Sequence, residues 1–259
     1  MRRLIGVGVG PGDPELITVK AVRVLRAADQ IFVPVLARPG EEDSAEEGRA
    51  EATVRAHADA GRIRRIAFAL NDQGGVTPGR SAAWDAAASA VAAAFGAGAR
   101  TVAFATIGDP AIYSTFSYLA QTVAGLAADV TIETVPGITA LQDLAARSGT
   151  VLAQGTESLV LLPLTAGADV LAEALARHDT VVGYKLGSVA GPGVDTVLGL
   201  LGKAGRLDQA VFGARLGLAG QDIRPAVELA GGGPVPYLST LISVRGRAGR
   251  GARLGGGQR

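Results

Sequence analysis

Short runs of apolar residues alternate along this chain with longer segments of helical periodicity. Such alternation is typical of β-α-β units and of a largely parallel sheet. The pattern predicts strands at residues 4–9, 30–35, 64–69, 101–106, 130–135, 159–162, 180–184, 210–214 and 239–244. It predicts helices at residues 14–28, 45–60, 81–95, 112–124, 169–177 and 194–203. We therefore expect an α/β fold.

The length of 259 residues is typical of one or two domains, and we expect two. We expect an N-terminal α/β domain over residues 1–125 and a C-terminal α/β domain over residues 126–246. The pattern itself places the boundary only within the window 125–149.

Two segments lack the apolar periodicity of a packed helix or strand. Residues 38–48 are rich in Glu and Asp and contain Pro39-Gly40, which predicts an exposed loop, with a lid over the site as the alternative. From Arg245 the chain reads R-G-R-A-G-R-G-A-R-L-G-G-G-Q-R, without apolar periodicity. We predict a disordered Gly/Arg-rich tail, over residues 247–259 at least.

Composition narrows the possible chemistry. Lys and Arg number 25 against 24 Asp and Glu, so a net charge of +1 gives no general argument for nucleic acid or an anionic membrane. The absence of cysteine excludes disulfides and thiolate-bound metals, and only two histidines, His57 and His178, are present. The first apolar run is too short for a signal peptide, and none reaches the roughly 20 residues of a membrane span. We expect a cytoplasmic protein without a metal.

Three loops share one arrangement, in which an apolar strand ends in Gly or Pro. They read G-V-G-V-G-P-G-D-P at 6–14, T-I-G-D-P at 106–110 and T-V-P-G-I-T-A at 134–140. In open α/β sheets, ligands bind outside the carboxyl ends of the strands, so these loops predict the ligand site. None of them contains Lys or Arg, which favours a ligand held by backbone groups and apolar walls over a polyphosphate.

A dinucleotide site is the obvious rival. Its G-x-G-x-x-G fingerprint does not fit, because the glycines at 6–12 alternate with single residues, and no acidic residue ends the second strand. Asp13 and Asp109 each precede a proline, so both also fit simple helix caps.

These loops resemble a known family. The run G-V-G-P-G-D-P-E-L-I-T-V-K-A at 8–21 resembles the opening signature of the S-adenosylmethionine-dependent tetrapyrrole methylases. The segments 108–110 and 135–140 resemble that family's second and third signatures, in order, and the resemblance extends from residue 4 to about residue 246.

Within the family, one subgroup is the most similar. G-D-P-A-I-Y-S-T-F-S-Y-L at 108–119, the pair Tyr184-Lys185 and G-L-A-G-Q-D at 217–222 resemble the precorrin-2 C20-methyltransferases of cobalamin synthesis. Gln221 departs from the glutamate expected there, which puts any charge-dependent role at this position in doubt.

The resemblance implies two α/β domains with S-adenosylmethionine in the cleft between them, in a homodimer. By position, the first-domain residues expected at the cofactor are Pro11, Ile107, Gly108, Asp109, Ile112, Thr139 and Ala140. Those expected from the second domain are Tyr184, Lys185 and Leu216.

The implied reaction methylates precorrin-2 at C20 to give precorrin-3A. Methyl transfer needs orientation and desolvation more than acid catalysis, which agrees with the lack of a visible catalytic triad. Asp109 and Tyr113 are the candidates for the base that removes the C20 proton, with a cofactor-side or packing role as the alternative for each.

A polycarboxylate substrate should meet local cations. The candidates are Arg38, Arg80, Lys185 and Arg215, each with a solvated surface charge as the alternative. We expect His57 and His178 to be ordinary helix residues, and Trp84 and Phe95 to serve packing.

Three other functions stay open. They are methylation of cobalt-precorrin-2 or of another ring position, nucleotide-binding regulation on the same fold without catalysis, and RNA binding through the Arg-rich tail. Of these partners we favour the small-molecule tetrapyrrole, with no nucleic acid and no membrane.

Overall fold

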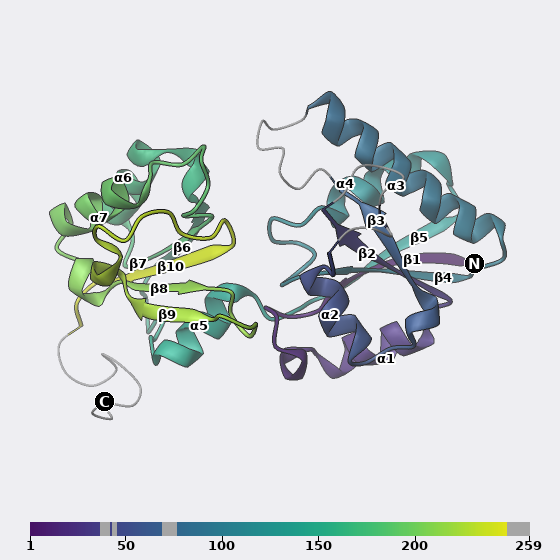
Figure 1. Ribbon diagram of the computed structural model, residues 1–259, viewed down its shortest axis with the longest axis horizontal. Helices are drawn as coiled ribbons and strands as arrows, with labels where there is room; N and C mark the ends of the chain where they lie inside the picture. The colour runs from purple at the N-terminus through teal and green to yellow at the C-terminus, as the bar shows by residue number, and fades with distance from the viewer. Residues whose placement is uncertain (37–41, 43–45, 69–76, 248–259) are drawn as a thin grey trace. The chain divides into compact units, whose positions relative to one another are not determined.

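The computed structural model describes residues 1–36, 42, 46–68 and 77–247 of the chain. These residues fall into two compact units, with the division between Thr139 and Ala140, and each unit is described by itself (Figure 1). The boundary falls inside the expected window but later than residue 126. Residues 126–139 belong to the first unit because the strand that they contain pairs with the first strand of the chain.

The first unit is a parallel sheet covered by helices. Its strands are β1 (Arg2–Gly8), β2 (Gln30–Val35), β3 (Ile63–Ala67), β4 (Thr101–Thr106) and β5 (Val130–Val135). Its helices are α1 (Val19–Ala27), α2 (Arg49–Arg55), α3 (Pro78–Gly96) and α4 (Phe116–Leu126), with short 3-10 helices at Pro14–Leu16 and Ala60–Arg62. The strand order is β3-β2-β4-β1-β5, and every neighbouring pair is parallel.

Alternate side chains of these strands enter two separate cores. Leu4 and Phe104 pack with α3 and α4 on one face, whereas Ile5 and Val7 pack with α1 and α2 on the other (Figure 1). A sheet buried on both faces needs nearly continuous apolar strands, which explains why the strand pattern was readable from the sequence.

The second unit contains a mixed sheet. Its strands are β6 (Leu159–Pro163), β7 (Thr180–Tyr184), β8 (Val211–Ala214), β9 (Asp222–Pro225) and β10 (Ser239–Val244). Its helices are α5 (Ala140–Ser148), α6 (Ala168–Arg177) and α7 (Val194–Lys203), with 3-10 helices at Leu164–Ala166, Leu207–Gln209 and Ala226–Leu229. The order is β6-β7-β10-β8-β9, in which β10 runs antiparallel to both neighbours. Helices α6 and α7 cover one face and α5 the other (Figure 1).

Several predicted helices are divided or shortened in the structure. The helix expected at 14–28 is a 3-10 turn capped by Asp13, followed by α1, which the Thr18 hydroxyl caps by accepting from the Ala21 amide. The helix expected from residue 112 begins only at Phe116, whose amide donates to the Ser114 hydroxyl. Local side-chain acceptors of this kind stop or restart a helix.

The beginning of the expected tail is packed. Arg245 donates from its backbone to the Asp179 carbonyl at 2.9 Å, and the Arg247 guanidinium pairs with the Glu157 carboxylate. The prediction that the tail is unpacked from Arg245, and the tail boundary at 247, were therefore wrong for these first residues. The rest of the tail, most of the predicted loop at 38–48, and Arg38 lie outside the described residues.

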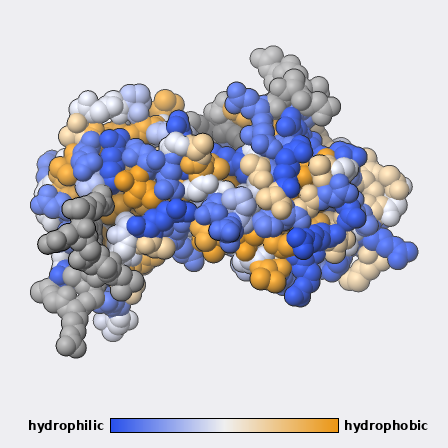
Figure 2. Space-filling view, turned by 60° about the horizontal axis from the view of Figure 1, so that its bottom comes forward, coloured by the Kyte–Doolittle hydropathy of each residue, from blue (hydrophilic) through white to orange (hydrophobic). Residues whose placement is uncertain are grey.

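On the side of each unit that Figure 2 shows, hydrophobic residues form small patches separated by hydrophilic ones. Among the described helices, none combines the length and hydropathy that a membrane crossing would need.

Candidate functional site

The three predicted loops leave three neighbouring strands at one edge of the first sheet. Strand β1 lies between β4 and β5, with Gly8 opposite Thr106 and Val7 opposite Val135. Because all three strands are parallel, their carboxyl ends meet at the same edge. The loops therefore start side by side, as the sequence predicted.

The loops approach one another backbone to backbone. A Cβ on Gly8 would lie 2.6 Å from the Gly108 carbonyl oxygen, and one on Gly137 would overlap that same oxygen. The Gly108 amide donates to the Gly10 carbonyl at 2.7 Å, and both glycines have a positive φ. Glycine is needed here for close approach as well as for conformation.

Asp109 joins the second loop to the third. Its Oδ1 accepts the Ala111 amide at 2.7 Å, and its Oδ2 accepts the Gly137 amide at 3.0 Å. The residues after Asp109 form a turn and not a helix, so the helix-cap alternative was wrong for this residue, whereas Asp13 does cap a 3-10 helix. With a backbone donor on each oxygen, the Asp109 carboxylate can hold two loops in register.

Two residues on and just after helix α2 hydrogen-bond to the first loop. The His57 Nε2, just after α2, lies 2.8 Å from the Pro14 carbonyl, which can only accept, so Nε2 carries the proton. The Thr53 hydroxyl donates a long bond of 3.5 Å to the Gly12 carbonyl. Both residues position the loop, a role that the sequence did not reveal because the partners lie about 40 residues apart.

A buried ion pair fixes α2 in turn. The Glu51 carboxylate is fully buried and lies 2.6 Å from the Arg55 guanidinium and 2.9 Å from the Arg65 guanidinium. Burial by itself raises the pKa of Glu51, but the hydrogen bonds from Arg65 and Arg55 outweigh burial and hold that pKa below its ordinary value.

Tyr113 stands out between β4 and α4. Its φ is +49°, and 49% of the residue is exposed. Partial burial raises the pKa of the phenol, which is therefore protonated at neutral pH and can donate a hydrogen bond more readily than accept a proton. Its neighbour Ile112 and the residues Pro11 and Thr139 lie on the same three loops, with Pro11 and Thr139 buried.

The second unit brings three more of the predicted residues together. Ala140, Tyr184 and Leu216 belong to one apolar cluster beneath α5. The Tyr184 hydroxyl accepts the Leu141 amide at 3.1 Å and so occupies a donor in the first turn of α5. Lys185 follows Tyr184 directly, with its ammonium 5.9 Å from the centre of the Tyr237 ring.

The other singled-out residues are placed as follows. Trp84 is buried and stacks on Tyr118 with ring centres 4.2 Å apart, and the Arg80 guanidinium lies over the Trp84 ring. Phe95 is buried in the same core, so packing is confirmed for both aromatics. Arg215 is exposed just after β8.

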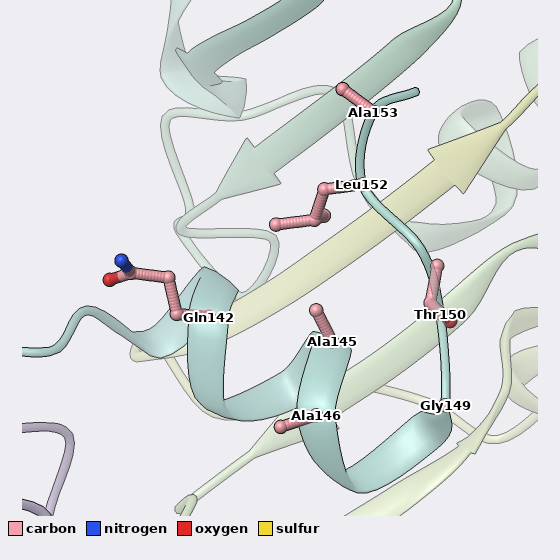
Figure 3. Close-up of a pocket in the computed structure, with 7 residues that line it drawn as sticks. All are labelled: Gln142, Ala145, Ala146, Gly149, Thr150, Leu152 and Ala153. Carbon is pink, nitrogen blue, oxygen red and sulfur yellow. The ribbon is translucent and has the colours of Figure 1, made fainter. Parts of the chain in front are cut away.

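One surface pocket of about 540 Å³ lies away from the predicted residues. Figure 3 shows its walls, formed by α5 and the segment that follows this helix. Its lining residues are Gln142, Ala145, Ala146, Gly149, Thr150, Leu152 and Ala153. This lining has no charged group, so it offers nothing specific to a sulfonium or a polycarboxylate.

Among the described residues, no group of His, Asp and Glu is arranged to hold a metal ion.

The sequence model of the family Tetrapyrrole (Corrin/Porphyrin) Methylases matches residues 3–229 of this chain. The chain belongs to this family. Membership makes it a methyltransferase.

Relatives match over nearly the whole chain. The cobalt-precorrin-2 C(20)-methyltransferase of Salmonella typhimurium is 31% identical over 93% of this chain and 95% of its own length. The precorrin-2 C(20)-methyltransferase of a Sinorhizobium species is 34% identical over 93% of this chain and 94% of its own.

A solved structure has the same fold. The uroporphyrin-III C-methyl transferase of Thermus thermophilus, complexed with S-adenyl homocysteine, superposes with a TM-score of 0.60 at 20% identity, over 93% of this chain and 92% of that one. The two-unit α/β architecture is thereby confirmed as the fold of the family.

Proposed function

We propose that this chain transfers a methyl group from S-adenosylmethionine to C20 of precorrin-2, giving precorrin-3A in cobalamin synthesis. The observation that carries the proposal is the full-length similarity to two C20-methyltransferases, together with the intact three-loop edge of the first sheet. Methylation of the cobalt-bearing substrate is the second candidate, because one of these two relatives is named for it.

The loops fit S-adenosylmethionine as the donor. They contain no Lys or Arg that would repel a sulfonium, they present backbone groups at close approach, and they include the Asp109 carboxylate. We propose that the donor is held by Pro11, Ile107, Gly108, Asp109, Ile112, Thr139 and Ala140, with Tyr184 and Leu216 contributing from the second unit.

When bound, S-adenosylmethionine supplies an activated methyl group whose leaving group is a neutral thioether. The C20 carbon gains a bond to this methyl as the carbon–sulfur bond breaks and its electron pair stays on sulfur. C20 then transfers its proton to a base, for which Asp109 and Tyr113 are the proposed candidates. The protein's part is to orient the two reactants and exclude water, which accounts for much of the rate in such displacements.

Asp109 and Tyr113 remain the proposed catalytic residues. The contacts of Asp109 favour positioning of the loops, and the raised pKa of Tyr113 favours a hydrogen-bond donor to the substrate. We also propose a cytoplasmic homodimer, as the family resemblance implies.

Parallel assays test the substrate. The protein is incubated with S-adenosylmethionine and either precorrin-2 or its cobalt complex, and methylated product is quantified by mass spectrometry. Faster turnover of the metal-free substrate supports the proposal, and turnover of the cobalt form alone would replace it by the second candidate.

A further inference from the structure

Three non-glycine residues among those described have left-handed backbone, and all three lie in loops after strands. They are Tyr113 with φ +49°, Lys185 with φ +66° and Arg215 with φ +51°. Such conformations are strained for residues with a Cβ, and strain of this kind gathers at functional sites. Two of the three are cations, and both belong to the second unit.

Lys185 and Arg215 stand at the same edge of the second sheet. Lys185 follows β7 directly and Arg215 follows β8 directly, and the antiparallel strand β10 starts between them. The Lys185 amide donates to the Ser239 carbonyl at 3.0 Å, while Ser239 pairs with Ala214. Two strand spacings separate their backbones, about 10 Å.

The loop after β8 is closed by a hydrogen bond between two of its own residues. The Gln221 Oε1 accepts the Gly217 amide at 2.9 Å and so closes the loop with a neutral side chain. The Arg215 side chain lies across this loop, since a Cβ on Gly220 would be 3.1 Å from its Nη1. The side chain that closes this loop therefore adds no carboxylate to it.

Glycine would satisfy the backbone at both positions at lower cost, as it does at Gly217 with φ +69°. The chain instead keeps a long cation at each. We propose that Lys185 and Arg215 form a two-point site for carboxylate groups of the tetrapyrrole substrate. The inference rests on the proposed function for the identity of the substrate, and it assigns Lys185 to the tetrapyrrole and not to the methyl donor.

Charge removal tests the site. The probe is uroporphyrin, a stable tetrapyrrole octacarboxylate, whose binding is followed by its fluorescence at low and moderate salt. We expect K185M and R215M each to weaken binding about tenfold and to flatten its salt dependence. The control is K203M at the end of α7, where binding should not change.

Glycine variants separate ligand binding from a structural role. K185G and R215G relieve the left-handed backbone, so we expect a higher thermal midpoint combined with weaker uroporphyrin binding. A lower thermal midpoint in both variants would show that the side chains serve the fold, and would overturn the inference.

Two further outcomes are decisive. Unchanged uroporphyrin binding in K185M and R215M overturns the inference, as does a loss of affinity for S-adenosylhomocysteine that equals the loss for uroporphyrin. If the variants lose uroporphyrin binding but the wild type does not methylate precorrin-2, the proposed function fails while the carboxylate site stands.

Discussion

Replacing Asp109 by alanine tests how the loops are held together. The variant loses the bond to the Ala111 amide within its own turn and the bond to the Gly137 amide in the third loop. The first is a hydrogen bond within a turn, worth about 1 kcal/mol. The second is charge-assisted and worth about 1.5–3 kcal/mol, so D109A should lower the free energy of unfolding by about 2.5–4 kcal/mol.

Asp59 provides a matched control. Its Oδ1 accepts the Gly61 amide at 2.9 Å in the same local arrangement, with no bond to another loop, so D59A should cost only about 1 kcal/mol. Urea unfolding followed by tryptophan fluorescence reports on the first unit, since Trp84 is the single tryptophan of the chain. The dissociation constant for S-adenosylhomocysteine, measured by calorimetry, should rise about tenfold or more in D109A alone. Equal losses of stability in the two variants would refute the cross-loop role.

Three other substitutions probe the same region, and two substitutions in the second unit serve as controls. G137A should abolish donor binding, measured by calorimetry, because the new Cβ overlaps the Gly108 carbonyl oxygen. The control G199A places its Cβ in open space on α7 and should raise the free energy of unfolding in urea by about 0.5–1 kcal/mol. E51Q should cost about 3 kcal/mol at neutral pH. The pKa of Glu51 in the folded protein lies below its ordinary value of 4.5, so its contribution to stability is present above pH 4.5 and is lost as the pH falls further. E51Q should therefore reduce the fall in the free energy of unfolding at acid pH. An unchanged fall would contradict the role of the ion pair. H57L should weaken S-adenosylhomocysteine binding several-fold by releasing the first loop, while H178L, in the second unit, should not; equal effects would remove the positioning role.

The strands, and the edge of the first sheet where the three loops meet, could be predicted because both depend on residues that are close together in the sequence. Strand β1 is apolar on both faces, and its carboxyl end carries glycines at the positions where backbones touch. The direction of β10 could not be predicted, because Ser239–Val244 is buried along its whole length and gives the same pattern in either direction. The short strand β9 has no fully buried residue and hence no apolar run.

The contacts that organise the site escaped prediction for a different reason. Asp109 reads as a helix cap from its neighbours, and only the fold brings the Gly137 amide, 28 residues away, to its second oxygen. His57 likewise has no local mark of its bond to Pro14. The left-handed backbone of Lys185 could not be predicted from the sequence either, because glycine is the residue type that usually indicates a positive φ.

The position of the new methyl group on the product tests methylation at C20 itself. Precorrin-2 is incubated with the protein and S-adenosylmethionine carrying a ¹³C-labelled methyl, and the product is examined by NMR. We predict a single labelled methyl attached to C20. A methyl at any other ring position, or no transfer to the tetrapyrrole, would contradict it.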